Sequence, residues 1–455
     1  MIADSMRLLS FLLVSSMAAL GADVPLGALL VNRVDEAKKA VAIVAATIGP
    51  NGRSLTAYGN LAKDRAVTPD GNTLFEIGSI TKVFTSLVLA DMVERGEVTL
   101  DTPVQSLLPE NVKVPTRNGK QITLLDLSMQ VSGLPRMPNN LRPADGANPY
   151  ADYDAPKLFE FLSGHELKRD IGEKYEYSNL GAGLLGFALA RKAGMSYEAM
   201  VRTRVLDPLG MKDTTVTLSD EFRRRLATGH DPALAPVKNW DLDALAVAGA
   251  LRSTAYDMLK FLAANLELTD TPLKPALRRM RSVRRPTGAE NIDIMMSWHT
   301  FTQENTDIMW HNGGTGGYRS FAGFNPATKT GAVVLCNTAY AIDDIGRHIL
   351  NPEYPLGMLS PPKKRTAVTL EAPVLAEYAG EYPFGPAFSI RITADAEHLY
   401  AQATGQPRFE IFAEKKDEFF LKVVDAQISF VRDEGGKVTA LVLHQNGMDQ
   451  KATRK

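Results

Sequence analysis

The sequence predicts an α+β fold in which a mostly helical region lies between two sheet-forming ends, followed by a small all-β domain. Apolar, strand-like runs occur near residues 41–58 and again at 318–337. The residues between them, from about 100 to 260, alternate short helical patterns with loops rich in proline and glycine. Residues 371–455 contain short alternating strands separated by turns, which is typical of a small barrel or sandwich.

The first sheet-forming end contains a hairpin and leads into a long helix. Residues 41–47 and 55–58 are apolar runs separated by the Gly-Pro-Asn-Gly turn at 49–52. From residue 80 to 95, apolar side chains recur at spacings of three and four, which predicts a helix. Gly96 supplies the expected stop.

The second sheet-forming end precedes the all-β domain. Residues 318–324 and 332–337 predict two strands joined by a loop, and residues 341–350 predict a closing helix. Residues 351–370 hold four prolines and a basic triplet, which predicts a linker. The all-β domain is then expected over residues 371–455.

Composition and charge exclude several classes of function. The formal net charge of -1 gives no general attraction for nucleic acid. The single cysteine, Cys336, lies in an apolar run and predicts a buried thiol. The seven histidines show no metal-ligand spacing, so neither a metal nor another cofactor is predicted. Arginine clusters at 223–225 and 278–285 are interpreted as solvated faces, with weak contact to a membrane or cell wall as the alternative.

The first residues have the features of an export signal. Arg7 precedes an apolar stretch over residues 8–20, and residues 19–21 (Ala-Leu-Gly) give a small-x-small cleavage pattern. The stretch is too short and too polar to favour a transmembrane helix. Residues 1–22 are therefore predicted to be a cleaved signal peptide of a periplasmic or secreted protein, with an uncleaved anchor as the alternative.

The first candidate catalytic pair is Ser79 and Lys82, at the start of the predicted helix. A helix N-terminus supplies unpaired N–H groups and a positive dipole end. A residue three positions on lies on the same helical face. A serine nucleophile needs both a proton acceptor and a field that tolerates negative charge. We therefore interpret Ser79 as a nucleophile and Lys82 as its base or base partner; an ordinary helix cap is the structural alternative.

Two further motifs supply the remaining candidate groups. In an extended loop, Tyr177 and Asn179 would face the same cleft, where a phenol can relay a proton and an amide can hold a substrate amide. The run His311-Asn312-Gly313-Gly314 lets a substrate backbone approach closely. Its backbone could complete an oxyanion hole with the N–H of Ser79.

Each of these short patterns also occurs elsewhere in the chain. Residues 360–363 repeat the Ser-x-x-Lys spacing, residues 58–60 repeat Tyr-x-Asn, and residues 329–331 form a Lys-Thr-Gly run. The first copy lies in the proline-rich linker and the last in an expected loop. No single motif therefore identifies the function, and the order of all three carries the argument.

The segment around Ser79 (residues 75–85) resembles the nucleophile segment of class C β-lactamases and related D,D-peptidases. Residues 96–103 and 208–214 are similar to flanking segments of that superfamily, and the second and third motifs match in order. The resemblance covers residues from about 35 to 350, and we expect the hydrolase domain over residues 23–350. It implies a β-lactamase/transpeptidase-like fold: an antiparallel sheet flanked by helices, beside an all-helical subdomain.

The resemblance also implies roles for these residues. Ser79 would form an acyl-enzyme, which water would hydrolyse, while Lys82 and Tyr177 share the proton transfer. Asn179, His311 and Gly313 would bind substrate, and the N–H groups of Ser79 and Gly314 would bind the oxyanion.

This sequence departs from the class C pattern at His311, where those enzymes usually carry lysine. Histidine is only partly cationic near neutral pH, so the carboxylate of a β-lactam would be held less strongly. Histidine there is more similar to some D,D-peptidases, D-aminopeptidases and esterases. The C-terminal domain resembles small lipocalin-like domains appended to such hydrolases.

We therefore predict a serine hydrolase that acts on a small-molecule or peptide substrate: a β-lactam, a D-Ala-type peptide or a short acyl ester. One alternative is a carboxylesterase that uses the same Ser-Lys-Tyr site. Another is a non-catalytic sensor that binds muropeptides, which the appended β-domain favours.

Overall fold

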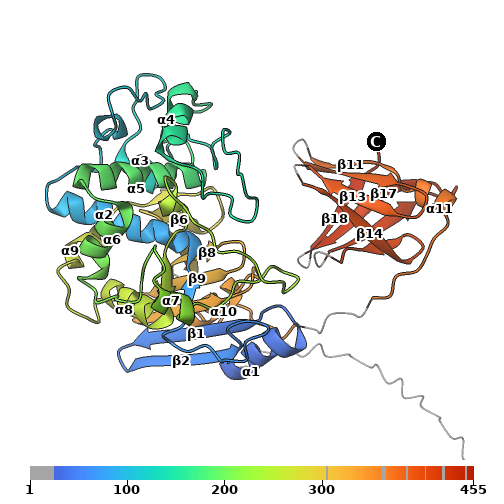
Figure 1. Cartoon of the computed structure of the whole chain (residues 1–455), viewed down its shortest axis with the longest axis horizontal. Helices are drawn as coiled ribbons and strands as arrows, with labels where there is room; N and C mark the ends of the chain where they lie inside the picture. The colour runs from blue at the N-terminus through green and yellow to red at the C-terminus, as the bar shows by residue number, and fades with distance from the viewer. Residues whose placement is uncertain are drawn as a thin grey trace, which may run out of the picture.

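The computed structural model describes residues 25–455, apart from 304–305, 360–364, 386–387, 405, 423–425 and 446–447. An eight-stranded antiparallel sheet with helices occupies the part before residue 350, and a second eight-stranded sheet follows it (Figure 1). The predicted α+β fold with an appended all-β domain is therefore confirmed. The predicted signal peptide, residues 1–22, lies outside the described residues.

The first part contains ten strands. They are β1 (Ala42–Gly49), β2 (Gly52–Gly59), β3 (Leu74–Glu76), β4 (Arg252–Thr254), β5 (Arg285–Pro286), β6 (Ile292–Met295), β7 (Trp298–Gln303), β8 (Thr306–Gly314), β9 (Arg319–Asn325) and β10 (Thr330–Cys336). The main sheet has the order β2-β1-β10-β9-β8-β7-β6-β5, while β3 and β4 form a separate pair. Strand β1 pairs with β10, with Ile43 opposite Cys336, so the two sheet-forming ends meet inside one sheet.

Helices cover both faces of this sheet. They are α1 (Leu26–Val31), α2 (Thr81–Glu94), α3 (Leu124–Ser128), α4 (Ala155–Gly164), α5 (Asn179–Ala193), α6 (Tyr197–Val201), α7 (Asp220–Arg225), α8 (Ala255–Asn265), α9 (Lys274–Arg279) and α10 (Asp343–Leu350). Short 3-10 or π turns are η1 (Asn32–Glu36), η2 (Gly78–Ile80), η3 (Val104–Leu107), η4 (Arg202–Leu206) and η5 (Ala246–Ala248). Most α-helices fall between β3 and β5, as the sequence predicted.

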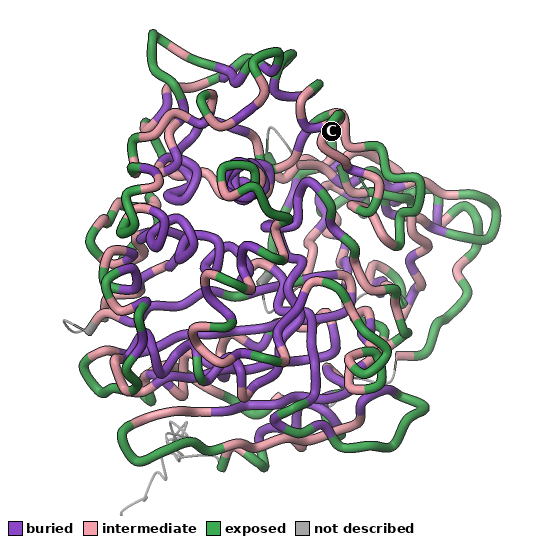
Figure 2. Tube along the Cα trace, turned by 60° about the vertical axis from the view of Figure 1, so that its left-hand side comes forward, coloured by how far each residue is buried: buried purple, intermediate pink, exposed green. Residues whose placement is uncertain are grey.

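The alternation of side chains along β1 explains why two cores form. Ile43 and Ala45 belong to one buried cluster, together with residues of α1 and α10. Val44 and Ala46 belong to the other cluster, together with residues of α2 and α8. Successive side chains of a strand point to opposite faces, so an apolar run without polar interruptions requires both faces to be covered. Figure 2 shows the resulting buried centre.

Helices α2 and α5, which carry the candidate residues Lys82 and Asn179, are packed closely inside the domain. Side chains of α2 are buried from Thr81 through Met92, so this helix lies inside the domain. Gly183 and Gly186 of α5 allow the backbone to approach η5, because a Cβ there would come within 2.6 Å and 2.0 Å of the side chains of Leu245 and Val247. This close approach of α5 fixes the position of η5.

The first half of the predicted linker is bound to the domain. The backbone N–H of Leu359 donates to Asn32 Oδ1 at 2.8 Å, and the Arg33 guanidinium donates to the Gly357 carbonyl at 3.0 Å. After residues 360–364, Val368 N–H donates to the carbonyl of Ala413 in the second part. On each side of residues 360–364, the predicted linker is therefore hydrogen-bonded to the neighbouring part of the structure.

The C-terminal part is a nearly closed barrel. Its elements are α11 (Ala372–Ala376), β11 (Gly380–Gly385), β12 (Phe388–Ala394), β13 (Leu399–Ala403), β14 (Arg408–Lys415), β15 (Glu418–Phe420), β16 (Ala426–Arg432), β17 (Val438–Gln445) and β18 (Met448–Thr453). The strands follow one another in sequence order, and the Lys455 N–H donates to the Glu381 carbonyl at 2.9 Å, linking the last strand to the first.

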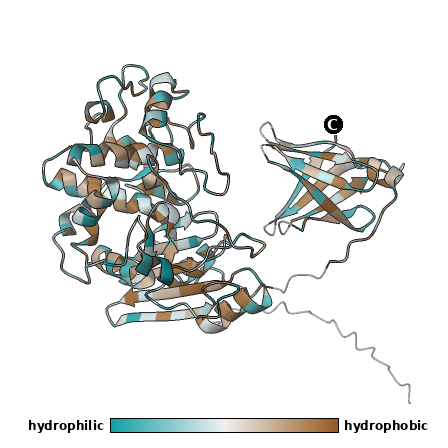
Figure 3. Ribbon diagram, viewed as in Figure 1, coloured by the Kyte–Doolittle hydropathy of each residue, from teal (hydrophilic) through white to brown (hydrophobic). Residues whose placement is uncertain are grey.

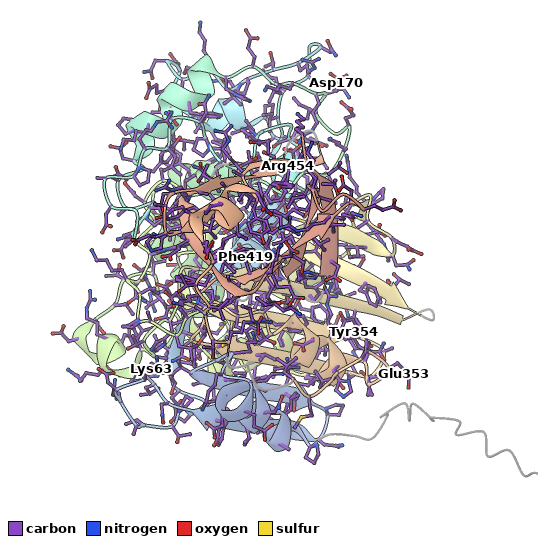
Figure 4. All side chains as sticks on the ribbon, turned by 90° about the vertical axis from the view of Figure 1, so that its right-hand side faces the viewer. Lys63, Asp170, Glu353, Tyr354, Phe419 and Arg454 are labelled. Atoms are coloured by element: carbon purple, nitrogen blue, oxygen red, sulfur yellow. The ribbon has the colours of Figure 1, made fainter. Side chains whose placement is uncertain are left out.

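The barrel interior is filled by aromatic and aliphatic side chains. Phe419, which Figure 4 labels, contacts Tyr378 and Phe430 with ring centres 4.9 Å and 5.5 Å away. Alternating hydropathy along the strands is visible in Figure 3. The barrel alternative of the sequence prediction is therefore the one observed.

Candidate active site

The structure brings Ser79 and Lys82 into contact. Ser79 lies in η2, which leads directly into α2, and Lys82 lies on the first turn of that helix. The Lys82 Nζ atom is 3.0 Å from Ser79 Oγ and donates to the Ala248 carbonyl at 2.8 Å. Ser79 Oγ also lies 3.3 Å from the same carbonyl. Residue 248, at the end of η5, therefore orients the amine that faces the serine.

Burial makes Lys82 suitable as a proton acceptor. Its side chain is 1% exposed. Desolvation lowers the pKa of Lys82 well below its usual value, and the nearby Arg136 cation lowers it further. An amine with a lowered pKa is available in its neutral form, and its lone pair can accept the hydroxyl proton of Ser79.

Tyr177 lies against the same pair. Its ring centre is 5.0 Å from Lys82 Nζ. Burial raises the pKa of Tyr177 to about 12, although a hydrogen bond with Ser79 and the charge of Arg136 oppose this rise. The phenol therefore keeps its proton near neutral pH and can donate it. The structure thus places an acceptor, Lys82, and a donor, Tyr177, beside the serine oxygen.

Asn179 occupies a different backbone setting from the one predicted. Ser178 is extended and caps α5, accepting from the Gly181 N–H at 2.8 Å, so Asn179 is the first helical residue and not part of an extended loop. Its N–H donates to the Arg136 carbonyl at 3.0 Å. Asn179 Oδ1 is buried and has no hydrogen-bond partner among the described residues. This oxygen is a free acceptor for a substrate N–H.

The third motif forms the last four residues of β8. Strand β7 pairs with β8 only as far as Trp310, so residues 311–314 pair with β9 alone. The edge that faced β7 is therefore open beyond this point. An open strand edge can bind an extended substrate backbone.

A close approach of two glycines joins this edge to the serine. A Cβ on Gly78 would lie 2.6 Å from the amide nitrogen of Gly314, and Gly78 itself has a φ of +50°. Neither feature suits a residue with a side chain. A Cβ on Gly313 would likewise lie 2.0 Å from the Ile77 carbonyl oxygen. The amides of Ser79 and Gly314 are thereby brought to neighbouring positions, as an oxyanion hole requires.

His311 is buried and uncharged. It is 2% exposed, and its Nδ1 lies 2.6 Å from the Asn312 carbonyl, which can only accept, so Nδ1 carries the proton. Desolvation lowers the pKa of His311 well below its usual value, and His299 and Lys82 lower it further. The neutral ring lies beside Tyr177, with centres 6.3 Å apart. His311 therefore adds no positive charge to the site.

Sequence reasoning missed four residues that shape this site. Ala248 supplies the carbonyl described above, and Arg136 lies with its guanidinium carbon 5.2 Å from the Tyr177 ring centre. Tyr175 and His299 form a second, partly buried layer, joined by a 2.9 Å hydrogen bond. Only Tyr175 carried a signal, because it lies two residues before Tyr177; the others reach the site through long-range folding.

The repeated motifs lie elsewhere. Lys329 lies in the turn before β10 and donates to the Leu266 carbonyl at 3.0 Å. Residues 360–363 lie outside the described part of the chain. Cys336 is buried, which raises the pKa of its thiol to about 12 and confirms the structural assignment. Within the described ranges, no cluster of three metal-ligating side chains occurs, and no helix is long and apolar enough to span a membrane.

Comparisons with known proteins identify the family of the chain. The sequence profile of the Beta-lactamase family matches residues 30–350, and a domain of unknown function (DUF3471) matches residues 364–454. The chain therefore belongs to the beta-lactamase family. Its relatives include the D-alanyl-D-alanine-carboxypeptidase/endopeptidase AmpH of Escherichia coli K12, which is 29% identical over 303 residues, covering 63% of this chain and 77% of the relative.

A second relative extends through both parts of the chain. Penicillin-binding protein 4* of Bacillus subtilis is 26% identical over 416 residues, covering 84% of this chain and 88% of the relative. Among solved structures, the beta-lactamase from Sulfitobacter sp. EE-36 has a TM-score of 0.60 at 25% identity, covering 69% of this chain and 92% of that one. The predicted superfamily is therefore confirmed.

Proposed function

We propose that the protein is a serine hydrolase that forms an acyl-enzyme on Ser79 with β-lactams or D-Ala-type peptides. The observation that carries the proposal is the 3.0 Å contact between Ser79 Oγ and a buried Lys82 whose pKa is lowered. The names of relatives that act as carboxypeptidase or penicillin-binding protein support the substrate class.

The proposed reaction has two halves. Ser79 Oγ attacks the substrate carbonyl carbon while its proton passes to Lys82 Nζ, and the new oxyanion is held by the N–H groups of Ser79 and Gly314. The bond between the carbonyl carbon and the leaving nitrogen then breaks as the Tyr177 phenol donates its proton to that nitrogen, and the proton held by Lys82 passes to Tyr177. In the second half, a water attacks the ester carbonyl, the bond from this carbon to Ser79 Oγ breaks, and a proton of the water returns to Ser79 Oγ through the same groups.

Substrate is held beside these atoms. Asn179 Oδ1 accepts from a substrate N–H, which supplies the partner that this buried oxygen lacks. Asn312 and Gly314 are exposed on the open edge of β8, while His311 and Gly313 face the interior. We propose that His311 and Gly313 act by shaping this edge.

A time-resolved mass measurement tests the proposal. Incubation with a penicillin is expected to add the mass of the opened drug to the wild type and nothing to Ser79→Ala. The rate at which the adduct is lost distinguishes a β-lactamase from a penicillin-inhibited peptidase. No adduct on the wild type, together with no hydrolysis of a chromogenic cephalosporin or a D-Ala-D-Ala peptide, would defeat the proposal.

A carboxylesterase is the second candidate. The neutral His311 favours it, because a site without a positive charge at position 311 can bind an uncharged ester as well as an anionic substrate. Turnover of p-nitrophenyl butyrate far above that of D-Ala-D-Ala peptides would support the esterase. Tight binding of muropeptides without turnover, unchanged in Ser79→Ala, would instead support a sensor.

We also propose that the protein works in the periplasm or outside the cell, and that residues 371–455 form a domain separate from the hydrolase. The substrate class supports the location, since D-Ala peptides belong to the cell wall. N-terminal sequencing of the mature protein after cell fractionation tests cleavage near residue 22; an intact leader in the cytoplasm would contradict it.

A further inference from the structure

Arg136 lies next to Tyr177 of the site. Its guanidinium carbon is 5.2 Å from the centre of the Tyr177 ring, and Lys82 Nζ is 5.0 Å from the same centre. The sum of these two distances is therefore an upper limit on the separation between the Arg136 guanidinium carbon and Lys82 Nζ. Lys82 is buried, whereas Arg136 is exposed. Its side chain is accessible to a ligand that approaches Ser79.

The backbone of Arg136 is fixed relative to the second motif. Its carbonyl accepts from the N–H groups of Asn179 at 3.0 Å and Leu180 at 3.2 Å. One residue earlier, the Pro135 carbonyl accepts from the Ser178 hydroxyl at 2.6 Å. These bonds tie the base of the arginine side chain to the start of α5, and no hydrogen bond from its guanidinium to another described residue is seen.

The positive charge of Arg136 has no carboxylate partner among the described residues. The acidic groups on neighbouring segments are engaged elsewhere: Glu176 pairs with Arg169, and Asp145 pairs with Lys238 at 2.8 Å. The charge nevertheless acts within the site, since it lowers the pKa of Lys82. An exposed, unpaired guanidinium next to a nucleophile is a site for an anion.

The other basic groups of the site are less available to bind an anion. His311 is buried and neutral, and Lys82 faces Ser79 and the Ala248 carbonyl. Arg319, beside the open end of β8, is only partly exposed, and its Nη1 donates to the carbonyls of Thr315 and Tyr318 at 3.0 Å and 2.9 Å. Among the described basic residues around the serine, Arg136 is therefore the exposed cation that remains available.

We propose that Arg136 is a specificity-determining residue that binds a carboxylate of the substrate, and that it replaces a charged residue at position 311. This inference rests on the proposed function of Ser79. It assigns the substrate class as acyl donors that carry both an amide N–H, accepted by Asn179 Oδ1, and a nearby carboxylate. A peptide ending in D-Ala and a β-lactam both have this chemistry.

The test compares each anionic substrate with an uncharged form of itself. The pairs are a diacetyl-Lys-D-Ala-D-Ala peptide with its C-terminal amide, and a chromogenic cephalosporin with its methyl ester. Charge-assisted hydrogen bonds contribute enough that Arg136→Gln is expected to lower kcat/KM for the free carboxylates roughly 10- to 100-fold. The uncharged forms are expected to change less than about 3-fold, and Arg136→Lys to recover part of the loss.

Arg142→Gln is the matched control, because Arg142 is exposed in the same loop and donates only to the carbonyls of Asn139 and Leu141 among the described residues. Arg142→Gln is expected to leave kcat/KM unchanged for both members of each substrate pair. A pH profile gives an independent readout. Removal of the Arg136 charge raises the pKa of Lys82, so the acid limb of kcat/KM moves to higher pH in Arg136→Gln.

The assignment of Arg136 would be overturned if Arg136→Gln lowered kcat/KM equally for the charged and uncharged substrate forms, or lowered it for neither. In that case covalent labelling of Ser79 in the wild type would leave the proposed function standing. If no substrate of either pair acylates the wild type, the proposed function itself fails, and the role of Arg136 fails with it.

Discussion

The close approach of Gly78 to Gly314 makes one substitution especially informative. In Gly78→Ala, the new Cβ would lie 2.6 Å from the Gly314 nitrogen and 3.1 Å from its carbonyl oxygen. These are backbone atoms, which cannot rotate away. Strand β8 must therefore shift relative to η2, and the amide of Gly314 must move away from its place beside Ser79.

The expected effect has two parts. A non-glycine residue at a φ of +50° costs about 1–2 kcal/mol, which lowers the free energy of unfolding. Displacing one oxyanion-hole donor typically lowers kcat about 10²- to 10³-fold. We therefore expect Gly78→Ala to fold with a modest loss of stability and to form the acyl-enzyme at least about 10²-fold more slowly.

Stopped-flow acylation by a chromogenic cephalosporin, together with urea unfolding, measures both parts. Gly194→Ala is the matched control: Gly194, at the end of α5, has a φ of +65°, and a Cβ added there would meet no atom within 4 Å. It is expected to lose only the stability that the positive φ costs, without loss of the acylation rate. A Gly78→Ala protein that acylates like the wild type would refute the assignment of the Gly314 amide to the oxyanion hole.

Three further predictions follow from the electrostatics of the site. Because the pKa of Lys82 is lowered, kcat/KM should be high at neutral pH and fall as the pH drops through that pKa; Lys82→Arg, which stays charged, should lose about 10²- to 10⁴-fold at neutral pH and should lack this acid limb. Tyr177→Phe should lower the acylation rate by a similar factor, and an unchanged rate would exclude the phenol as donor. Burial lowers the pKa of His299 from 6.5 to about 4, so protonation favours the unfolded chain, and the free energy of unfolding should fall by roughly 3 kcal/mol as the pH drops between these values. Urea unfolding should show a flatter pH dependence for His299→Gln than for the wild type.

Local patterns predicted much of the fold, because the relevant interactions are short in sequence. The hairpin of β1 and β2, helix α2 and the strands β9 and β10 all appear within a few residues of their expected positions. The contact between Ser79 and Lys82 also depends on a single helical turn. By contrast, Arg136 and His299 reach the site through tertiary packing, and no local pattern marks them.

Two expectations about the site required the structure. A tyrosine and an asparagine two positions apart suggested an extended loop, but the Ser178 hydroxyl caps α5 and makes Asn179 helical. The charge of His311 depends on its neighbours, since burial beside His299 and Lys82 keeps the imidazole neutral. Neither a capping choice nor a desolvation penalty can be read from residue types alone.

The pairing of β1 with β10 has a consequence for how the chain acquires its structure. The strand that completes the middle of the sheet, β10, is the last of the described strands before residue 350 to be synthesised. Until it is present, β1 has only β2 as a partner, and a two-stranded hairpin is marginally stable in water. Contacts between such distant residues also form slowly. A nascent chain with this topology stays open until late, a property that would suit the export proposed above.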